Sequence, residues 1–335
     1  MRVTRLTDRR EVPVHSVPVR SPMTGRLRIG AVTLATLAAV GAGDAAGGQL
    51  PTRYVAHLGD IERVGAFYGV LQLGLFNRVG RVELSTPDPR FDPGGALLDQ
   101  RLEAFEGRFV GLTQLGLYNR IYRSAYVGVR VGVVNMTGSL LGPEGRYRGL
   151  IDAGLVNLTF GHHAGLLQLG AVNHASGFLG VAQLGGWNSI EGLRIRCLVQ
   201  AGALNWALKG SGARVGMQIG GLNALASAGD WRRPGLGVLQ LGAVNVGQNA
   251  LVGLQLGVVN VGLDALAAGQ IALFNLVRGR FAGAAVGVVN AHRSVRGVQL
   301  GLVNYAGNLR GVQLGLLNVA GSGGLPVTVV LNIGF

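Results

Sequence analysis

The sequence has little of what most enzymes and disulfide-stabilised domains rely on. It contains one cysteine, Cys197, and one lysine, Lys209, among 335 residues, and aromatic side chains make up only 6% of the chain. A single cysteine excludes a disulfide within the chain and a metal site built from thiolates. Cys197 lies in the apolar stretch IRCLVQAG, which predicts a buried and unreactive thiol.

Motifs that mark active sites are also missing. No G-x-S-x-G, H-E-x-x-H, P-loop or dinucleotide-binding fingerprint occurs in a supporting context, and the frequent Gly-x-Gly strings belong to a repeat. The neighbouring His162 and His163 lack a third ligand in the sequence and are expected to be exposed turn residues. We therefore predict that the protein is not an enzyme, with no catalytic, cofactor-binding or metal-binding residues and no cofactor.

The charge is strongly positive but dispersed. The formal net charge is +14, and arginine supplies nearly all of the positive charge. The arginines stand singly or in pairs in turn-like stretches, whereas nucleic-acid binding favours a clustered basic face with interleaved aromatics. The pattern favours solvated loop charges or contacts with anionic lipid headgroups, and it predicts no nucleic-acid partner.

Long apolar runs are absent beyond the N-terminal region, although apolar residues make up 48% of the chain. Gln, Asn and Arg interrupt every run before the ~20 residues that a spanning helix needs. Glycine accounts for 58 residues, and a glycine in a helix interior costs about 1 kcal/mol relative to alanine. The glycine content therefore argues against a helical solenoid.

What the chain does contain is one repeated unit. The unit reads G-h-Q-h-G-h-h-N, where h is apolar, followed by a short variable turn, and the last copies are 14 or 15 residues apart. A residue that recurs in every copy of a repeat is expected to be structural, because each repeat is one supersecondary unit. The asparagine of the unit occurs at Asn77, Asn119, Asn135, Asn157, Asn173, Asn188, Asn205, Asn223, Asn245, Asn260, Asn275, Asn290, Asn304, Asn318 and Asn332.

Three segments are expected along the chain. Residues 1–22 are rich in Arg and Pro and are interpreted as disordered or as the product of an upstream start codon. Residues 23–48 have a positive start, an apolar stretch of about a dozen residues and small residues after it, which is the layout of a signal peptide. Residues 49–335 form one repeat β domain with a loop insertion at 78–106.

The insertion contains STPDPRFDPGG, whose turn chemistry predicts a loop. Leu97 to Phe105 is expected to form a short amphipathic helix whose acidic residues face solvent. Asp88 and Asp92 lack the spacing of a calcium-binding loop, so a plain turn is preferred.

Eight alternating residues followed by a turn predict a strand. Side chains alternate along a strand, so one face is expected to carry Val298, Leu300, Leu302 and Asn304, and the other Gln299, Gly301, Val303 and Tyr305. Both faces are largely apolar and neither carries charge, which indicates a sheet that is covered, or that faces lipid, on the side away from its own core. The fold class is therefore predicted to be all-β, built from 14–16-residue strand–turn repeats.

Two all-β architectures fit the repeats. The preferred one is an antiparallel outer-membrane β-barrel of about 16 strands, because VTVVLNIGF alternates up to a terminal aromatic, Phe335. The alternative is a parallel β-solenoid, in which Asn and Gln stack as ladders from coil to coil. The barrel carries a conflict, since the face that ends at Phe335 aligns with glutamine in earlier copies and would place it against lipid.

The unit also carries a resemblance. The copies of G-h-Q-h-G-h-h-N-x-A, with a Pro-containing last copy, LPVTVVLNIGF, resemble the bacterial surface-repeat proteins first noted in leptospires. The likeness covers about 69–335 and is most specific in the last hundred residues. It implies a location at the surface or outer membrane and implies no chemistry. Arg130, Asp152 and Ala285 depart from it, since glutamine is expected at each.

The expected function is that of a non-enzymatic outer-membrane or cell-surface repeat protein, structural or pore-like, exported by a Gram-negative-type bacterium. The barrel hypothesis predicts contact with outer-membrane lipid and with the barrel-assembly machinery through the strand that ends at Phe335. The alternative is a surface-displayed β-solenoid that binds an unidentified surface ligand through its loops.

Overall fold

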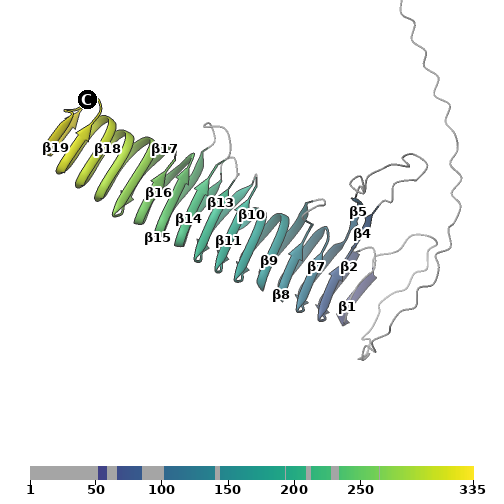
Figure 1. Ribbon diagram of the computed structural model, residues 1–335. Coiled ribbons are helices and arrows are strands. Elements are labelled where there is room, and N and C mark those ends of the chain that lie inside the picture. Colours follow the sequence, from purple (N-terminus) through teal and green to yellow (C-terminus); the bar gives the residue numbers. More distant parts are fainter. Residues whose placement is uncertain are drawn as a thin grey trace, which may run out of the picture. The chain divides into compact units, whose positions relative to one another are not determined.

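The computed structural model describes residues 52–58, 66–84, 102–139, 144–192, 194–208, 213–227, 234–263 and 265–335 (Figure 1). All of them belong to one compact unit, Thr36–Phe335, and the described part contains strands and no helix. The expected segments 1–22 and 23–48 lie outside the described residues.

Nineteen strands fall within the described residues. The strands are β1 Thr52–Leu58, β2 Ala66–Leu73, β3 Phe76–Val79, β4 Arg81–Leu84, β5 Leu102–Glu106, β6 Arg108–Leu115, β7 Tyr118–Ile121, β8 Ser124–Thr137, β9 Gly145–Leu169, β10 Val172–Leu184, β11 Trp187–Glu191, β12 Ile195–Ala201, β13 Leu204–Leu208, β14 Arg214–Ala226, β15 Gly235–Gln248, β16 Ala250–Gly262, β17 Ala265–Ile271, β18 Phe274–Ala320 and β19 Val327–Gly334.

Successive repeats pair in parallel and in register. Between β14 and β15, for example, Gln218 is opposite Gln240 and Asn223 is opposite Asn245. The same residue-on-residue pairing recurs from β2 and β6 onwards, so each repeat forms one coil that stacks on the coil before it (Figure 1). The all-β prediction is confirmed, and the solenoid-like parallel arrangement is the one found. The antiparallel barrel of about 16 strands is wrong, because an antiparallel neighbour would bring each asparagine opposite a different residue of the repeat.

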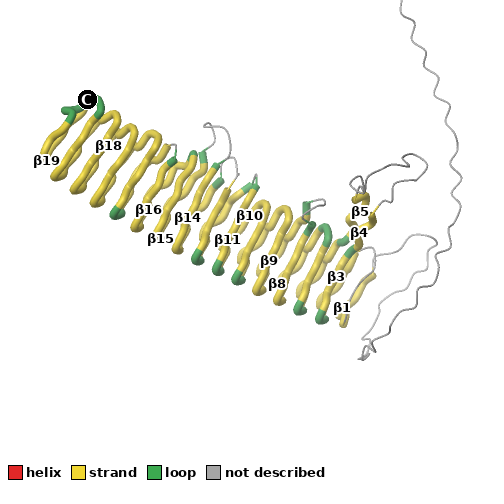
Figure 2. The backbone as a smooth tube through the Cα atoms, in the orientation of Figure 1, coloured by secondary structure: helices red, strands yellow, loops and turns green. Residues whose placement is uncertain are grey.

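The expected two-faced alternation is wrong within each coil. Gln200 and Asn205 are both fully buried, although five positions apart they would occupy opposite faces of a straight strand. The chain bends at Gly202–Ala203, between β12 and β13, and this bend reverses the phase. Such short bends follow one another along one side of the stack (Figure 2). Glutamine therefore points inward, which removes the conflict of glutamine facing lipid.

The glycine three residues before each asparagine leaves room for the asparagine of the preceding coil. A Cβ at Gly315 would lie 2.0 Å from the carbonyl oxygen of Gly301 and 2.6 Å from Nδ2 of Asn304. Ala272 is a natural exception at this position, and the contact beside it is longer. Nδ2 of Asn260 lies 3.3 Å from the carbonyl oxygen of Ile271, against 2.6–3.0 Å for the equivalent contact in the other coils.

The apolar core is filled by size matching along the strand. Where a large ring lies ten residues before the ladder asparagine, a glycine follows two residues later, as in Phe109 and Gly111. A Cβ at Gly111 would lie 2.8 Å from Cζ of Phe109. In other coils the first residue is small and the second is larger, as in Ala125 and Val127. Gly235 and Gly237 are an exception, and the side chain of Leu225 lies beside both of them, so the interior stays closely packed.

The two ends of the stack differ. β1 pairs in parallel with β2, whereas β19 turns back and pairs antiparallel with β18. Asn332, the last asparagine of the pattern, donates to Oε1 of Gln313 at 3.2 Å and to the carbonyl oxygen of Leu325 at 2.9 Å. The last copy of the unit therefore covers the final coil and adds no further parallel coil.

The insertion at 78–106 contains a β-hairpin. β4 and β5 pair antiparallel as a separate two-stranded sheet, with Val82 opposite Phe105. The expected helix is wrong over 102–105, which lie in β5, because pairing with β4 gives this segment a backbone partner. Asp88 and Asp92 lie outside the described residues.

Candidate functional site

The interior of the stack is lined by a ladder of asparagines. Nδ2 of each asparagine donates to Oδ1 of the asparagine in the next coil, and this chain of bonds is unbroken from Asn77 to Asn318 at 2.7–3.0 Å. The same Nδ2 also donates to a carbonyl oxygen of the next coil, as Asn304 does to Leu314 at 2.9 Å. Every ladder asparagine is buried, and these bonds satisfy amides that would otherwise be costly to bury, except Oδ1 of Asn77 in the first rung, which has no partner among the described residues.

A second ladder, of glutamines, runs beside the first with the opposite polarity. Nε2 of Gln183 donates back to Oε1 of Gln168 at 2.8 Å, and the later glutamines repeat this contact up to Gln270. Asparagine amides therefore donate toward the C-terminal coils and glutamine amides toward the N-terminal coils. The two rows of amide dipoles oppose each other, which limits the net dipole along the stack.

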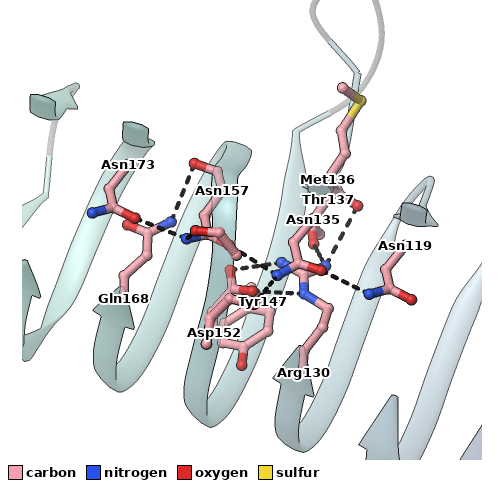
Figure 3. Close-up of polar contacts among 12 residues, drawn as sticks. Asn119, Arg130, Asn135, Met136, Thr137, Tyr147, Asp152, Asn157, Gln168 and Asn173 are labelled. Atoms are coloured by element: carbon pink, nitrogen blue, oxygen red, sulfur yellow. Dashed lines mark hydrogen bonds and ion pairs between the residues drawn. The ribbon is translucent and has the colours of Figure 1, made fainter. Parts of the chain in front are cut away.

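A buried ion pair replaces two rungs of the glutamine ladder (Figure 3). Nε and Nη2 of Arg130 donate to the two carboxylate oxygens of Asp152 at 2.8 and 2.7 Å, and both side chains are fully buried. Nη1 of Arg130 donates to Oγ1 of Thr137 at 2.8 Å, and the guanidinium lies 4.8 Å from the centroid of the Tyr147 ring. Arg130 and Asp152, two of the residues that depart from the repeat, therefore compensate each other in adjacent coils.

Electrostatics and hydrogen bonding at this pair are tightly coupled. Burial acts to lower the pKa of Arg130, but the charge of Asp152 and its hydrogen bonds outweigh burial, so the pKa is raised. Burial and then Asp152 raise the pKa of Tyr147, whose hydroxyl donates to the carbonyl oxygen of Ile151 at 2.9 Å. Gln114 lies opposite Arg130 in the preceding coil and receives no hydrogen bond from it. Its Oε1 is therefore buried without a hydrogen-bond partner among the described residues. The pair is thus held firmly while it interrupts the ladder.

Ala285 is the third position where the repeat lacks its glutamine. The side chain of His292, from another side of the coil, makes hydrogen bonds in place of that glutamine. Nε2 of His292 lies 3.1 Å from Oε1 of Gln270, and its Nδ1 contacts Nε2 of Gln299. The glutamine oxygen only accepts and the amide nitrogen only donates, which assigns the neutral imidazole with its proton on Nε2. His292 therefore occupies the gap left by Ala285 and carries the ladder on to Gln299 and Gln313.

Protonation of His292 is expected to weaken the fold in mild acid. Burial lowers its pKa to about 3, below the ordinary value of 6.5. The unfolded chain therefore takes up the proton first, and stability that is present above pH 6.5 is lost as the pH falls toward 3. The pKa difference corresponds to a loss on the order of 2 kcal/mol at pH 5.

The double variant Ala285→Gln with His292→Ala tests this assignment. It restores glutamine to the ladder and alanine to the position that Ala306 and Ala320 occupy in later coils. We expect its melting temperature to fall less than that of the wild type between pH 7 and pH 5, while His292→Ala alone lowers stability at both pH values. An equal fall for wild type and double variant would show that His292 does not carry the acid sensitivity.

The prediction that His163 is an exposed turn residue is wrong, because its side chain is buried in a stack of rings. Its ring stacks between Tyr147 and Phe178, with centroid separations of 4.4 and 5.0 Å. Neither ring nitrogen has a hydrogen-bond partner among the described residues, and burial lowers its pKa to about 4. His162 points outward and is partly exposed, 3.5 Å from Glu144. The two histidines diverge because neighbouring residues of a strand face opposite sides.

A cavity of about 620 Å³ lies next to this stack, where the connections between coils leave the strands. It is lined by three exposed arginines, Arg146 and Arg148 at the start of β9 and Arg194 just before β12, together with His162 and Glu191. Two grooves further along the stack are lined only by Leu, Ile, Val, Ala and Gly, whereas a third contains Arg196 and Arg214.

Two edges of the stack differ in chemistry. The bend edge consists of the seven residues before each ladder asparagine, from Val70–Phe76 to Gly311–Leu317; these segments contain two charged residues, Arg130 and Asp152, and both are buried. The loop edge consists of the connections that begin about three residues after each ladder asparagine. Three strands that precede longer connections, β8, β13 and β14, end at this edge, two or three residues after their ladder asparagines, at Thr137, Leu208 and Ala226.

The described residues give no sign of metal or thiol chemistry. No group of three His, Cys, Asp or Glu side chains within the described ranges is arranged to hold a metal ion. Cys197 is buried as predicted, and burial raises the pKa of its thiol to about 12, so the thiolate is not formed at neutral pH. Within the described ranges there is no helix long and apolar enough to cross a membrane.

Comparison with known proteins adds no relative. No family model, no curated protein and no solved structure matches the chain. The function is therefore argued from the loop edge, the bend edge and the buried ladders. Sequence reasoning singled out Arg130 and Asp152 as departures but missed that they pair; opposite charges at the same position of adjacent repeats were the signal.

Proposed function

We propose that this chain is a non-enzymatic repeat protein displayed at the outer membrane or cell surface of a Gram-negative-type bacterium, where its loop edge binds a partner that carries negative charge. The observation that carries the proposal is that β8, β13 and β14 end at the same edge of a stack whose spacing is fixed by buried ladders, so the connections that follow them start from that edge. Repeat proteins commonly bind through loops that a rigid stack holds in a row.

Charge supports a negatively charged partner. Arg146 and Arg148 from the start of β9 and Arg194 from the connection between β11 and β12 line one cavity, with Glu144 and Glu191 as the acidic residues nearby. Guanidinium groups bind carboxylate and sulfate groups in two-pronged contacts, and a net charge of +14 favours approach of an anion. Pore formation and contact with the barrel-assembly machinery are not part of the proposal, because both rest on a closed antiparallel barrel.

Surface display is tested on whole cells. Protease added outside intact cells is expected to cleave the chain within its long connections, and carbonate washing compared with detergent extraction reports how it is held. Protection from protease in intact cells, with cleavage only after lysis, would contradict surface display.

Partner binding is tested with a sulfated oligosaccharide as the probe. Replacing Arg146, Arg148 and Arg194 by glutamine is expected to weaken binding at least tenfold at physiological salt. The matched control replaces Arg293, Arg296 and Arg310, which removes the same charge elsewhere on the stack and is expected to change binding less than twofold. Equal losses in both variants would show that only net charge matters and would contradict a site at the cavity.

A further inference from the structure

The bend edge is unusual for a surface that faces water. Large apolar side chains are exposed on it in successive coils, for example Val288, Leu302 and Leu316, which stand two residues before their ladder asparagines. The polar side chains of this edge, the ladder glutamines, point inward and are fully buried. An uncharged apolar strip that continues through all the parallel coils exceeds what isolated surface hydrophobics explain.

The backbone of the bend edge is also satisfied. The amide of Gly116 donates to the carbonyl oxygen of Val131 at 3.0 Å, and the amide of Val133 donates to Leu117 at 2.9 Å. Equivalent bonds cross the bend from coil to coil at Gly170, Gly185 and Gly202. A protein partner would normally use about one hydrogen bond per 100–200 Å² of interface, and this strip offers few groups for that purpose. Satisfied backbone and absent charge are instead what hydrocarbon demands.

The positions of the arginines set a depth. In β18, Arg296 and Arg310 lie five residues before the bend glycines Gly301 and Gly315, and Arg293 lies five residues after Val288. At ~3.3 Å per residue this separation is about 16 Å, close to the ~15 Å of one hydrocarbon leaflet. A coil inserted bend-first would therefore place its arginines at the depth of lipid headgroups on both sides of the bend.

From these observations we infer that the bend edge is a lipid-binding surface, which lies in one leaflet of a membrane that contains anionic lipid, with the arginines of the flanking strands against the headgroups. This inference rests on the proposed surface location and names what holds the chain there. The loop edge then lies at the membrane surface, where its cavity faces the water.

The test is flotation of the purified full chain with phosphatidylcholine vesicles and with vesicles containing one quarter phosphatidylglycerol. Wild type is expected to float with both, more with the anionic vesicles. The variant Val288→Glu, Leu302→Glu, Leu316→Glu is expected to lose at least nine-tenths of its binding to phosphatidylcholine vesicles. The control Ser294→Glu, Asn308→Glu, Ser322→Glu adds the same charge in the same three coils at the loop edge, and its binding to phosphatidylcholine vesicles is expected to stay within twofold of wild type.

Far-ultraviolet circular dichroism checks that both variants keep the β fold. A second measurement needs no variant: lipids brominated in the acyl chain are expected to quench tryptophan fluorescence, because Trp187 is exposed beside the bend. Unchanged flotation of the bend variant, or no quenching, would overturn the inference. The inference would also be overturned if the wild type were a dimer, the bend variant were a monomer, and neither protein floated. A second copy of the chain would then cover the apolar strip. Surface cleavage by protease is independent of these results, so failure of flotation leaves the proposed function standing.

Discussion

Arg130→Gln is expected to lower the free energy of unfolding by about 3–5 kcal/mol, because it leaves the buried carboxylate of Asp152 without its partner. Asp152→Gln is expected to cost a similar amount by leaving the guanidinium unpaired. The double variant Arg130→Gln, Asp152→Gln restores two rungs of the glutamine ladder. It also supplies a donor for Oε1 of Gln114, which now has no partner among the described residues. Its stability is therefore expected to equal or exceed that of the wild type.

The four proteins form a double-mutant cycle, measured by urea unfolding followed by circular dichroism. The exposed Arg310→Gln serves as the control for loss of one positive charge and is expected to change stability by less than about 0.5 kcal/mol. A double variant as unstable as the worse single variant would contradict the view that an ion pair and two glutamines are exchangeable at this position.

The asparagine ladder is expected to be equally sensitive. Asn304→Ala removes the acceptor of Asn290 Nδ2 and the donor to Asn318 Oδ1 and the Leu314 carbonyl, and it leaves a cavity. We expect a loss of about 3–5 kcal/mol in the free energy of unfolding. Thermal and urea unfolding measure the change.

Two asparagines of the same coils provide controls. Asn308 makes an exposed contact with Ser322, and Asn308→Ala is expected to change stability by less than about 0.5 kcal/mol. Asn318 ends the ladder and donates only to the carbonyl oxygen of Gly315, so Asn318→Ala is expected to cost less than Asn304→Ala. Similar costs for Asn304 and Asn308 would show that the ladder contributes little.

The sequence predicts the coil but not its cross-section. The repeat of Gln and Asn at a fixed separation was enough to expect strands, a structural role for asparagine and, as the alternative, amide ladders. Alternation along a strand could not predict that Gln200 and Asn205 both point into the core. The bend at Gly202–Ala203 reverses which side of the chain faces inward, and its two small residues do not mark a bend in the sequence. The terminal alternation up to Phe335 is real, yet it belongs to a strand that covers the last coil.

The compensations inside the core were only partly readable. Arg130 and Asp152 occupy the same position of adjacent repeats, so their pairing follows from a parallel register once that register is known. His292 was less accessible, because it stands two residues after an asparagine and reaches across the coil to the glutamine row. Its role depends on the distance between two sides of one coil, which spacing along the sequence does not give.

The parallel stacking of the coils is tested most directly by distances between pairs of spin labels, measured by pulsed electron resonance in a Cys197→Ala background. One label replaces Leu316, and the second replaces in turn Val258, Ala203 or Leu155, which occupy the same exposed position four, seven and ten coils earlier. At ~4.8 Å per coil, the account predicts distances of about 19, 34 and 48 Å. Distances that fail to grow with the number of coils would contradict the parallel stack.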